Sequence, residues 1–562
     1  MPTRVLVALV ALILGPPASA ADPVAPLKPL VPPDAAIVFV VRNLGPQLKA
    51  LGESPMAAWL ATSPLFKQFV DPKEAEKLVA VRDFLTAQLG VTADELRDDI
   101  FGDAVVFAFQ PGEPGKPETD AGTLLVRPRD PAALHRLVER VNKFQQATGE
   151  LAAVTPAEHG GVRYFVRVKA TKDREFYAFH DKLFVLTNRE SALHGVLAKS
   201  RAPDAVALPK WLALDDGRGT LTALFNPRAF DAAWAARAAN GPDAGDRAFH
   251  KQFGKVWAAF DGLSLTAAAG ENLTLRVAAD IDDARLPPEW QRLLTPPAGP
   301  APGVVAPAGA LVAVNASVNL RTLLDVASPF LPDGGAALRK QLDEAVGPAV
   351  GRDDLPAVLD TLGPEVSVWV RPSATAATLD AALAVRLGPT PADAARLAPP
   401  LRLALDTLAH LWRVDRNRKH ADQVGLRPGA DGLTAENPRG FPAGFAPSYR
   451  VAAESGYAVV TSHPDVRVSP STKAVEKPPL LRLSLADGHA YLRDHRAAVA
   501  IFLAGYEGRP AAEVERELGK LLPVLESGKS LEVRLSRDGR RVAATVTVEF
   551  VKPLTSEIKP AR

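Results

Sequence analysis

The chain has 562 residues, of which 47% are hydrophobic and 23% charged, with a formal net charge of +2 and no cysteine. This length exceeds what one hydrophobic core supports and predicts two to four domains. The balanced charge gives no electrostatic footprint for nucleic acid or an anionic membrane. The lack of cysteine excludes disulfides, thiolate catalysis, zinc–cysteine sites and iron–sulfur clusters.

The first twenty residues, MPTRVLVALVALILGPPASA, have the pattern of a signal peptide. A basic start is followed by an apolar run, two prolines and a small-residue site that predicts cleavage after Ala20. An uncleaved anchor would need about 20 apolar residues, roughly twice this run. We therefore expect a soluble mature protein in the periplasm or outside the cell.

The first half then begins with an alternating strand at 32–41, in which Ile37, Phe39 and Val41 share one face. A helix is predicted over 73–89, and Thr92 with Glu95 forms a capping box for the next helix. The strand FGDAVVFAFQP follows, ending at residue 111.

Further along, Asp130 is predicted to cap a helix whose first residue is Pro131. A hairpin turns at 180–182, and Asn226 is predicted as an N-cap after a strand. An antiparallel strand pair from Ser264 ends this half.

The second half repeats these features in the same order. LGPEVSVWVRP matches FGDAVVFAFQP with an offset of 363 − 102 = 261 residues between the glycines. Further matches include Val385-Arg386 for Val126-Arg127, a hairpin turning at 454–456, Asp487 as the N-cap that answers Asn226, and a strand pair turning at Asp538-Gly539. The repetition predicts a duplicated module.

The predicted fold class is α+β, with two tandem copies of a module whose antiparallel sheets are covered by helices, most simply on one face. A proline-rich linker joins the copies. The expected divisions are a signal peptide at 1–20, module 1 at 21–283, the linker at 284–304, module 2 at 305–552 and a tail at 553–562.

Three stretches of the first half, PPDAAIVFVVRNL, ESPMAAWLATSPLFKQF and GVTADELRDDIFGDAVVFAF, resemble an uncharacterised family of large secreted bacterial proteins that carry a domain of unknown function. The resemblance covers the first 110 residues best. It implies tandem α+β modules after a signal peptide, and it transfers no catalytic residue to this chain.

The ten histidines form no HExxH motif and no pair at i, i+4. Loop positions are predicted for His159, His180 and His463, and different helix faces for His489 and His495. The elbow G-x-S-x-G and the dinucleotide motif G-x-G-x-x-G are also missing from the sequence.

Acidic and basic clusters of the sequence are candidate binding sites. A hard cation could be held by Asp98, Asp99 and Asp103, or by Asp280, Asp282 and Asp283. Neither cluster has calcium-loop spacing, so the simpler interpretation is a helix end and a sheet end.

ESGKS at 526–530 lacks the first glycine of a phosphate loop, because Pro523 stands there. RVDRNRKHADQ from Arg413 is predicted as an exposed loop after a helix at 401–412, with a phosphate- or polymer-contacting loop as the alternative.

The sequence therefore assigns no catalytic, cofactor-binding or metal-binding residue and no cofactor. The favoured function is an exported, non-catalytic envelope protein with a binding or structural role, in which a groove between the duplicated halves holds the ligand. Candidate partners are an envelope protein, a peptide, a lipid or a polymer, and not nucleic acid. The alternative is an extracytoplasmic hydrolase with a dispersed active site in one module.

Overall fold

A computed structural model describes most of the chain. The described residues are 22–54, 56–57, 72–113, 116–201, 208–295, 304, 306–318, 320–331, 335–337, 340, 344, 362–373, 379–388, 390–419, 421–437, 445–468, 478–507, 509–526 and 528–551. The predicted signal peptide, residues 296–303 of the predicted linker and the predicted tail lie outside them.

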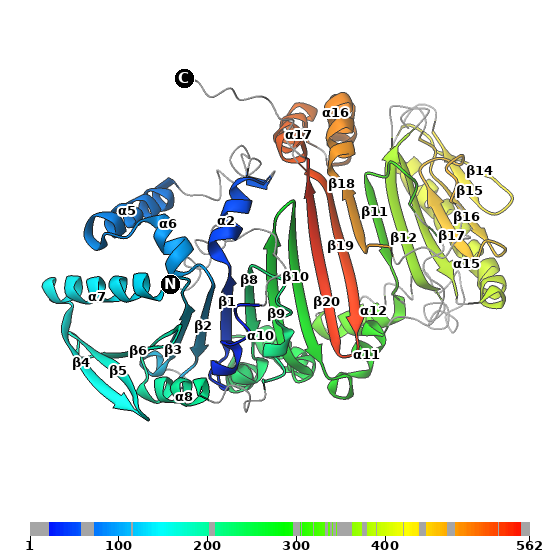
Figure 1. Ribbon diagram of the computed structural model, residues 1–562. Coiled ribbons are helices and arrows are strands. Elements are labelled where there is room, and N and C mark those ends of the chain that lie inside the picture. Colours follow the sequence, from blue (N-terminus) through cyan, green and yellow to red (C-terminus); the bar gives the residue numbers. More distant parts are fainter. Residues whose placement is uncertain are drawn as a thin grey trace, which may run out of the picture. The chain divides into compact units, whose positions relative to one another are not determined.

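The protein is α+β, with helices and a large antiparallel sheet (Figure 1). It divides into two compact units. Unit 1 comprises residues 1–243, 257–282 and 536–562, and unit 2 comprises 244–256 and 283–535. The chain thus enters unit 2 at residue 244, again at residue 283, and returns to unit 1 for its last strand.

The strands of unit 1 form one antiparallel series. Their order is β4 (Leu151–His159), β5 (Val162–Lys169), β6 (Arg174–His180), β7 (Leu183–Thr187), β3 (Ala121–Arg127), β2 (Ala104–Gln110), β1 (Ile37–Arg42), β8 (Leu221–Phe225), β9 (Phe260–Ala269), β10 (Asn272–Ile281) and β20 (Arg541–Phe550). The predicted hairpin at 180–182 joins β6 to β7, with Asp181 in the left-handed backbone region that such tight turns require.

Helices connect these strands. They are η1 (Lys28–Leu30), α2 (Leu44–Gly52), α5 (Pro72–Leu89), α6 (Ala93–Glu95), η2 (Leu96–Ile100), η3 (Pro117–Thr119), α7 (Pro131–Ala147), α8 (Glu190–Ser200), η5 (Leu212–Leu214), η6 (Pro227–Phe230) and α9 (Asp231–Asn240). Three predicted caps are confirmed, because the side chains of Thr92, Asp130 and Asn226 accept hydrogen bonds from backbone N–H groups of Glu95, Ala132 and Arg228.

Both faces of the unit 1 sheet are covered where α7 and α8 lie, so the expectation of helices on one face is wrong for strands β3, β6 and β7 (Figure 1). Leu193 and Val196 of α8 pack on Val185, and Leu134 and Leu137 of α7 pack on the opposite face. Both faces are covered because these strands have apolar side chains at successive positions, which must be buried on both sides.

Unit 2 has its own antiparallel series. The order is β14 (Gly425–Pro428), β15 (Leu433–Glu436), β16 (Ser448–Ala452), β17 (Tyr457–Thr461), β13 (Leu379–Leu387), β12 (Leu362–Pro372), β11 (Val312–Ala316), β18 (Leu481–Ser484) and β19 (Gly528–Asp538), of which the last runs into unit 1 from residue 536.

The helices of unit 2 correct three expectations. They are α10 (Ala244–Trp257), η7 (Asp283–Arg285), α11 (Pro288–Leu294), α12 (Leu320–Ala327), η8 (Ser328–Phe330), α15 (Pro391–Lys419), α16 (Leu485–Glu507) and α17 (Ala511–Glu526). The predicted linker contains α11, in which Pro288 takes the first helical position that proline tolerates. The predicted N-cap Asp487 lies inside the first turn of α16. Residues 413–419 of the predicted basic loop are the last part of α15.

No helix in the described ranges is long and apolar enough to cross a membrane.

Candidate functional site

Two of the predicted loop histidines pair with acids of their own turns. His180 ends β6 and lies 3.8 Å from the Asp181 carboxylate, and His463 lies 3.4 Å from Asp465. The loop prediction holds for His463, but His159 and His180 are each the last residue of a strand. His489 and His495 both lie in α16, whose helical geometry is interrupted at His495.

His159 makes a contact that the sequence did not indicate. It ends β4, and its ring stacks on His194 of α8 with the ring centroids 3.7 Å apart. The two residues are far apart in sequence and share no spacing motif, so no pattern could have linked them.

The acidic clusters are paired with arginines. Arg540 lies 2.9 Å from Asp280 and 3.7 Å from Asp282, and it also pairs with Asp261. Asp98 pairs with Arg97, whose hydrogen bond holds the pKa of this carboxyl below its usual value. Within the described ranges, no group of three acidic or histidine side chains is arranged to hold a metal ion. Asp98 and Asp99 lie in the last turn before β2, and Asp280 lies at the end of β10, as the interpretation of a helix end and a sheet end predicted.

The glycine of ESGKS has a packing role. Gly528 is the first residue of β19, and a Cβ there would lie 2.4 Å from Cδ1 of Leu485, the first residue of α16. A side chain at this point would require the Leu485 side chain to shift, so the glycine has a packing explanation that involves no phosphate.

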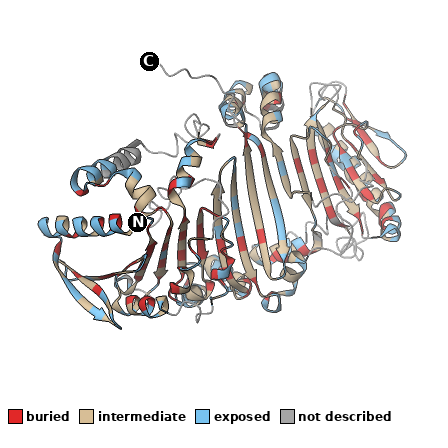
Figure 2. Ribbon diagram, in the orientation of Figure 1, coloured by how far each residue is buried: buried red, intermediate tan, exposed pale blue. Residues whose placement is uncertain are grey.

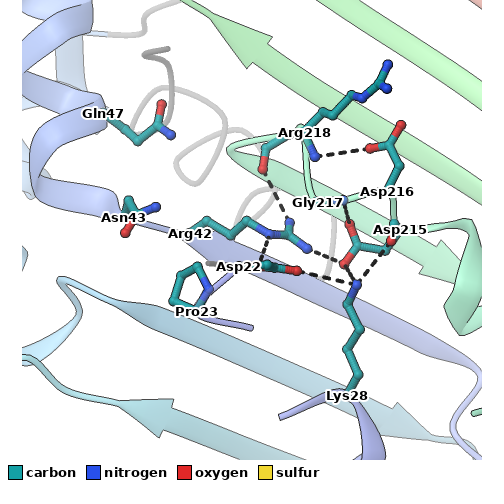
Figure 3. A pocket seen from close by; sticks show the side chains of 11 residues that line it. Asp22, Pro23, Lys28, Arg42, Asn43, Gln47, Asp215, Asp216, Gly217 and Arg218 are labelled. Atoms are coloured by element: carbon teal, nitrogen blue, oxygen red, sulfur yellow. Dashed lines mark hydrogen bonds and ion pairs between the residues drawn. The ribbon is translucent and has the colours of Figure 1, made fainter. Parts of the chain in front are cut away.

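An ion-pair network in unit 1 consists of Asp22, Lys28, Arg42 and Asp215 (Figure 3). The Lys28 ammonium lies 2.9 Å from Asp215 and 3.5 Å from Asp22. The Arg42 guanidinium donates to Asp22 at 3.0 Å and also pairs with Asp215. The side chains of Arg42 and Asp215 are only 3% and 0% exposed.

Three separate segments bring these charges together. Lys28 opens η1, Arg42 ends β1 on its buried side, and Asp215 follows η5. The four charged residues of the network line a cavity of about 240 Å³ together with Gln47 and the exposed Arg218. The side chain of Arg218 extends away from the network (Figure 3). Two cations face two carboxylates, so the groups satisfy one another. This arrangement is better explained as a structural ion-pair network that holds the start of the described chain against the sheet than as a catalytic centre.

The ionisation of Asp22 should make unit 1 sensitive to acid. Burial alone would raise the pKa of Asp22, but the charge and hydrogen bond of Arg42, the Val24 N–H and the charge of Lys28 hold the pKa below 3.8. The folded state therefore favours the carboxylate, and this stabilisation is present above pH 3.8 and disappears as the pH falls through the lowered value.

We expect the difference in free energy of unfolding between the wild type and Asp22→Asn to be greatest near neutral pH and to shrink below pH 3.8. Urea unfolding at a series of pH values measures this difference. Asp83→Asn, which changes an exposed carboxylate on α5, is the control and should show a small difference. A difference for Asp22→Asn that stays constant down to acid pH would contradict the assignment.

An apolar sheet face is the second candidate site in unit 1. It consists of side chains that point to one side of the strands from β2 to β20. The paired positions form rows: Phe109, Ile37, Phe225, Leu263, Ala279 and Val542; Phe107, Phe39, Ala223, Leu265, Val277 and Ala544; and Val105, Val41, Leu221, Ala267, Leu275 and Val546. Every one of these side chains is a hydrocarbon.

This apolar sheet face is partly open to solvent. The exposed fractions are 38% for Phe107, 44% for Leu265, 39% for Leu275 and 52% for Val277. Leu265 and Val277 are direct neighbours across the ladder, so their exposed surfaces are continuous. Strands β10 and β20 are mostly of intermediate burial, whereas β1 and β2 have more buried positions (Figure 2).

The opposite side of the same strands is the better covered one, although on β9, β10 and β20 its side chains are smaller or polar. Ser264, Ala278 and Ala543 on that side are buried. A Cβ at Gly262 would lie 2.7 Å from Cβ of Trp211, which shows how closely the segment around η5 packs there. In an ordinary antiparallel sheet the larger apolar side chains are the buried ones, so the open apolar sheet face calls for a functional explanation.

Comparison of the chain with protein-family models, with curated proteins and with solved structures finds no match.

Proposed function

We propose that this protein is an exported binding protein without catalysis of its own, and that its apolar sheet face carries a hydrocarbon chain, such as the acyl chain of a lipid. The observation that supports the proposal most is the exposure of Leu265, Leu275 and Val277 at adjoining positions of a face without polar side chains. Contiguous exposed apolar surface of this kind is typical of ligand or partner sites.

The chemistry of the face favours hydrocarbon over the other partners considered. The backbone N–H and C=O groups of these strands are used in the sheet ladder. A peptide or polysaccharide would bring donors and acceptors that find no partner there, and each unsatisfied group costs about 1–3 kcal/mol. An acyl chain has no such groups and gains about 25 cal/mol for each Å² of apolar surface that it buries.

We further propose that the two units descend from one duplicated module. Their strand pairings support this when the strands of each unit are counted in chain order. The first strand, β1 or β11, pairs with the second and the eighth, and the third strand, β3 or β13, pairs with the second and the seventh. The register of the paired strands also agrees between the two units. Thr123 faces Thr187 in unit 1, and Ala382 faces Thr461 in unit 2, at offsets of 382 − 123 = 259 and 461 − 187 = 274. The same two offsets separate Val126 from Val385 (385 − 126 = 259) and the hairpin turn at 180 from that at 454 (454 − 180 = 274).

Export rests on the N-terminal sequence, and the fold is compatible with cleavage after Ala20. Val24 and Leu27 are already buried in the core of unit 1. Cleavage after Ala20 would leave both of these side chains in the mature chain.

Native mass spectrometry of the protein purified from its own envelope fraction tests the proposal. We expect a chain that begins at Ala21 and carries an extra mass, which organic extraction removes and fragmentation identifies as a molecule with an acyl chain. The extracted protein should regain mass when it is incubated with phospholipid. A bare chain that takes up no phospholipid would refute the carrier function, and an intact N-terminus would refute the export.

A further inference from the structure

Helix α15 of unit 2 has apolar side chains on its outer side as well as its inner side. The inner side packs on β13 and β16 through residues that include Leu397, Ala398 and Leu401. The outer side carries Leu403 and Leu411, which are 60% and 61% exposed. Residues on one helix face recur at intervals of three or four.

We define the outer stripe of α15 as Leu403, Thr407, Leu411 and Val414. Apart from Thr407 these side chains are apolar, and Trp412 beside them is also largely exposed. A shallow hollow of about 350 Å³ follows the same stripe between Asp406 and Val414. The outer stripe thus presents three apolar side chains around Thr407, and the exposed His410 and the half-buried Asp406 line the hollow beside them.

The end of the same helix is basic. Its last turns contain Arg413, Arg416, Arg418 and Lys419 against the single acid Asp415. Lys419 pairs with Asp415, and Arg416 pairs with Asp422. No acidic side chain of the described residues pairs with Arg413 or Arg418. This is the basic cluster that the sequence shows from Arg413 onward.

We propose that α15 docks the protein on the surface of a bilayer that contains anionic lipids. The outer stripe enters the boundary between headgroups and acyl chains, Trp412 lies at the interface that tryptophan favours, and the basic end contacts anionic headgroups. An apolar face joined to lysine and arginine on one helix is the pattern of interfacial helices. The docking goes beyond the proposed carrier function, since it needs neither the apolar sheet face nor a bound ligand.

Cosedimentation of the full chain with vesicles tests the docking. Binding is expected with vesicles of equal parts phosphatidylglycerol and phosphatidylcholine, to be at least tenfold weaker with phosphatidylcholine alone, and to weaken as salt is added. Leu411→Ser and the double variant Arg413→Gln/Arg418→Gln are each expected to weaken binding to the anionic vesicles about tenfold.

Ile501→Ser is the matched control, because Ile501 lies on α16 and is 66% exposed. It should bind as the wild type does, as should variants of the apolar sheet face, which separates this test from the test of the carrier function. Leu411, Arg418 and Ile501 are exposed and Arg413 is half-buried, and thermal unfolding checks that each variant folds. Equal binding to both kinds of vesicle, or unchanged binding by Leu411→Ser, would overturn the proposal. Self-association that Leu411→Ser abolishes, without vesicle binding, would instead assign the stripe to a second copy of the chain.

Discussion

Replacement of Asp215 by alanine is expected to lower the free energy of unfolding of unit 1 by about 3–5 kcal/mol. The buried Asp215 carboxylate pairs with the Arg42 guanidinium and with the Lys28 ammonium. Its removal leaves two cations that share one remaining carboxylate, Asp22. An uncompensated buried charge is far more destabilising than the absence of a whole ion pair, so this substitution should rank among the most harmful in the unit.

Urea unfolding followed by tryptophan fluorescence measures this effect, since Trp211 lies in the core of unit 1. Arg218→Ala is the control, because Arg218 lines the same cavity but is exposed, and it should change stability by about 0.5 kcal/mol or less. The double variant Arg42→Met/Asp215→Leu removes both charges and should be more stable than Asp215→Ala. Equal unfolding midpoints for Asp215→Ala and Arg218→Ala would show that the network does not hold the fold.

Introduction of a charge on the apolar sheet face should abolish acyl-chain binding. Leu275→Asp places a carboxylate where the proposed ligand lies, and an aspartate facing hydrocarbon costs about 2.5–3.5 kcal/mol, or about a hundredfold in affinity. The milder Leu275→Thr keeps a residue that suits a strand and should weaken binding about tenfold. Titration with a fluorescent fatty acid measures both affinities.

The matched control is Leu208→Asp, since Leu208 is an exposed leucine of unit 1 outside the sheet, and it should bind as the wild type does. Because Leu275 is itself partly exposed, its replacement should leave the core intact, which the urea midpoint verifies. If Leu275→Asp binds the fatty acid as tightly as Leu208→Asp does, the ligand lies elsewhere.

Local signals in the sequence predicted the elements well. Asp130 and Pro131 mark the start of α7 because capping and the missing proline N–H act within one helical turn. The hairpin turn at Asp181 was predictable for the same reason. Such features need no knowledge of distant residues.

The sites depend on distant residues, and the sequence did not predict them. Asp22 and Asp215 are 215 − 22 = 193 positions apart, and neither stands in a motif. The end of α15 was predicted as a loop because charged residues from Arg413 onward interrupt the leucine pattern. Arginine and lysine are nevertheless good helix formers and suit the C-terminal turn, and the helix continues to Lys419.

The sequence predicted only part of the apolar sheet face. Alternation correctly placed Ile37, Phe39 and Val41 on one side of β1. The side that is more deeply buried, however, is the one with Val38 and Val40. Both sides of this strand are apolar, so periodicity alone could not indicate which of them faces solvent.

The pairing of β20 with β10 means that the order of synthesis matters for this chain. Strand β10 is complete at residue 281, but its neighbour begins only at residue 541, after 541 − 281 = 260 further positions. At about 5–20 residues per second, a nascent β10 waits roughly 13–52 s for that partner. Throughout this interval it presents an unpaired edge beside exposed Leu275 and Val277, the kind of template on which strands of other chains assemble. Holdase chaperones that bind extended apolar segments would therefore act on this protein chiefly before its last strand has emerged.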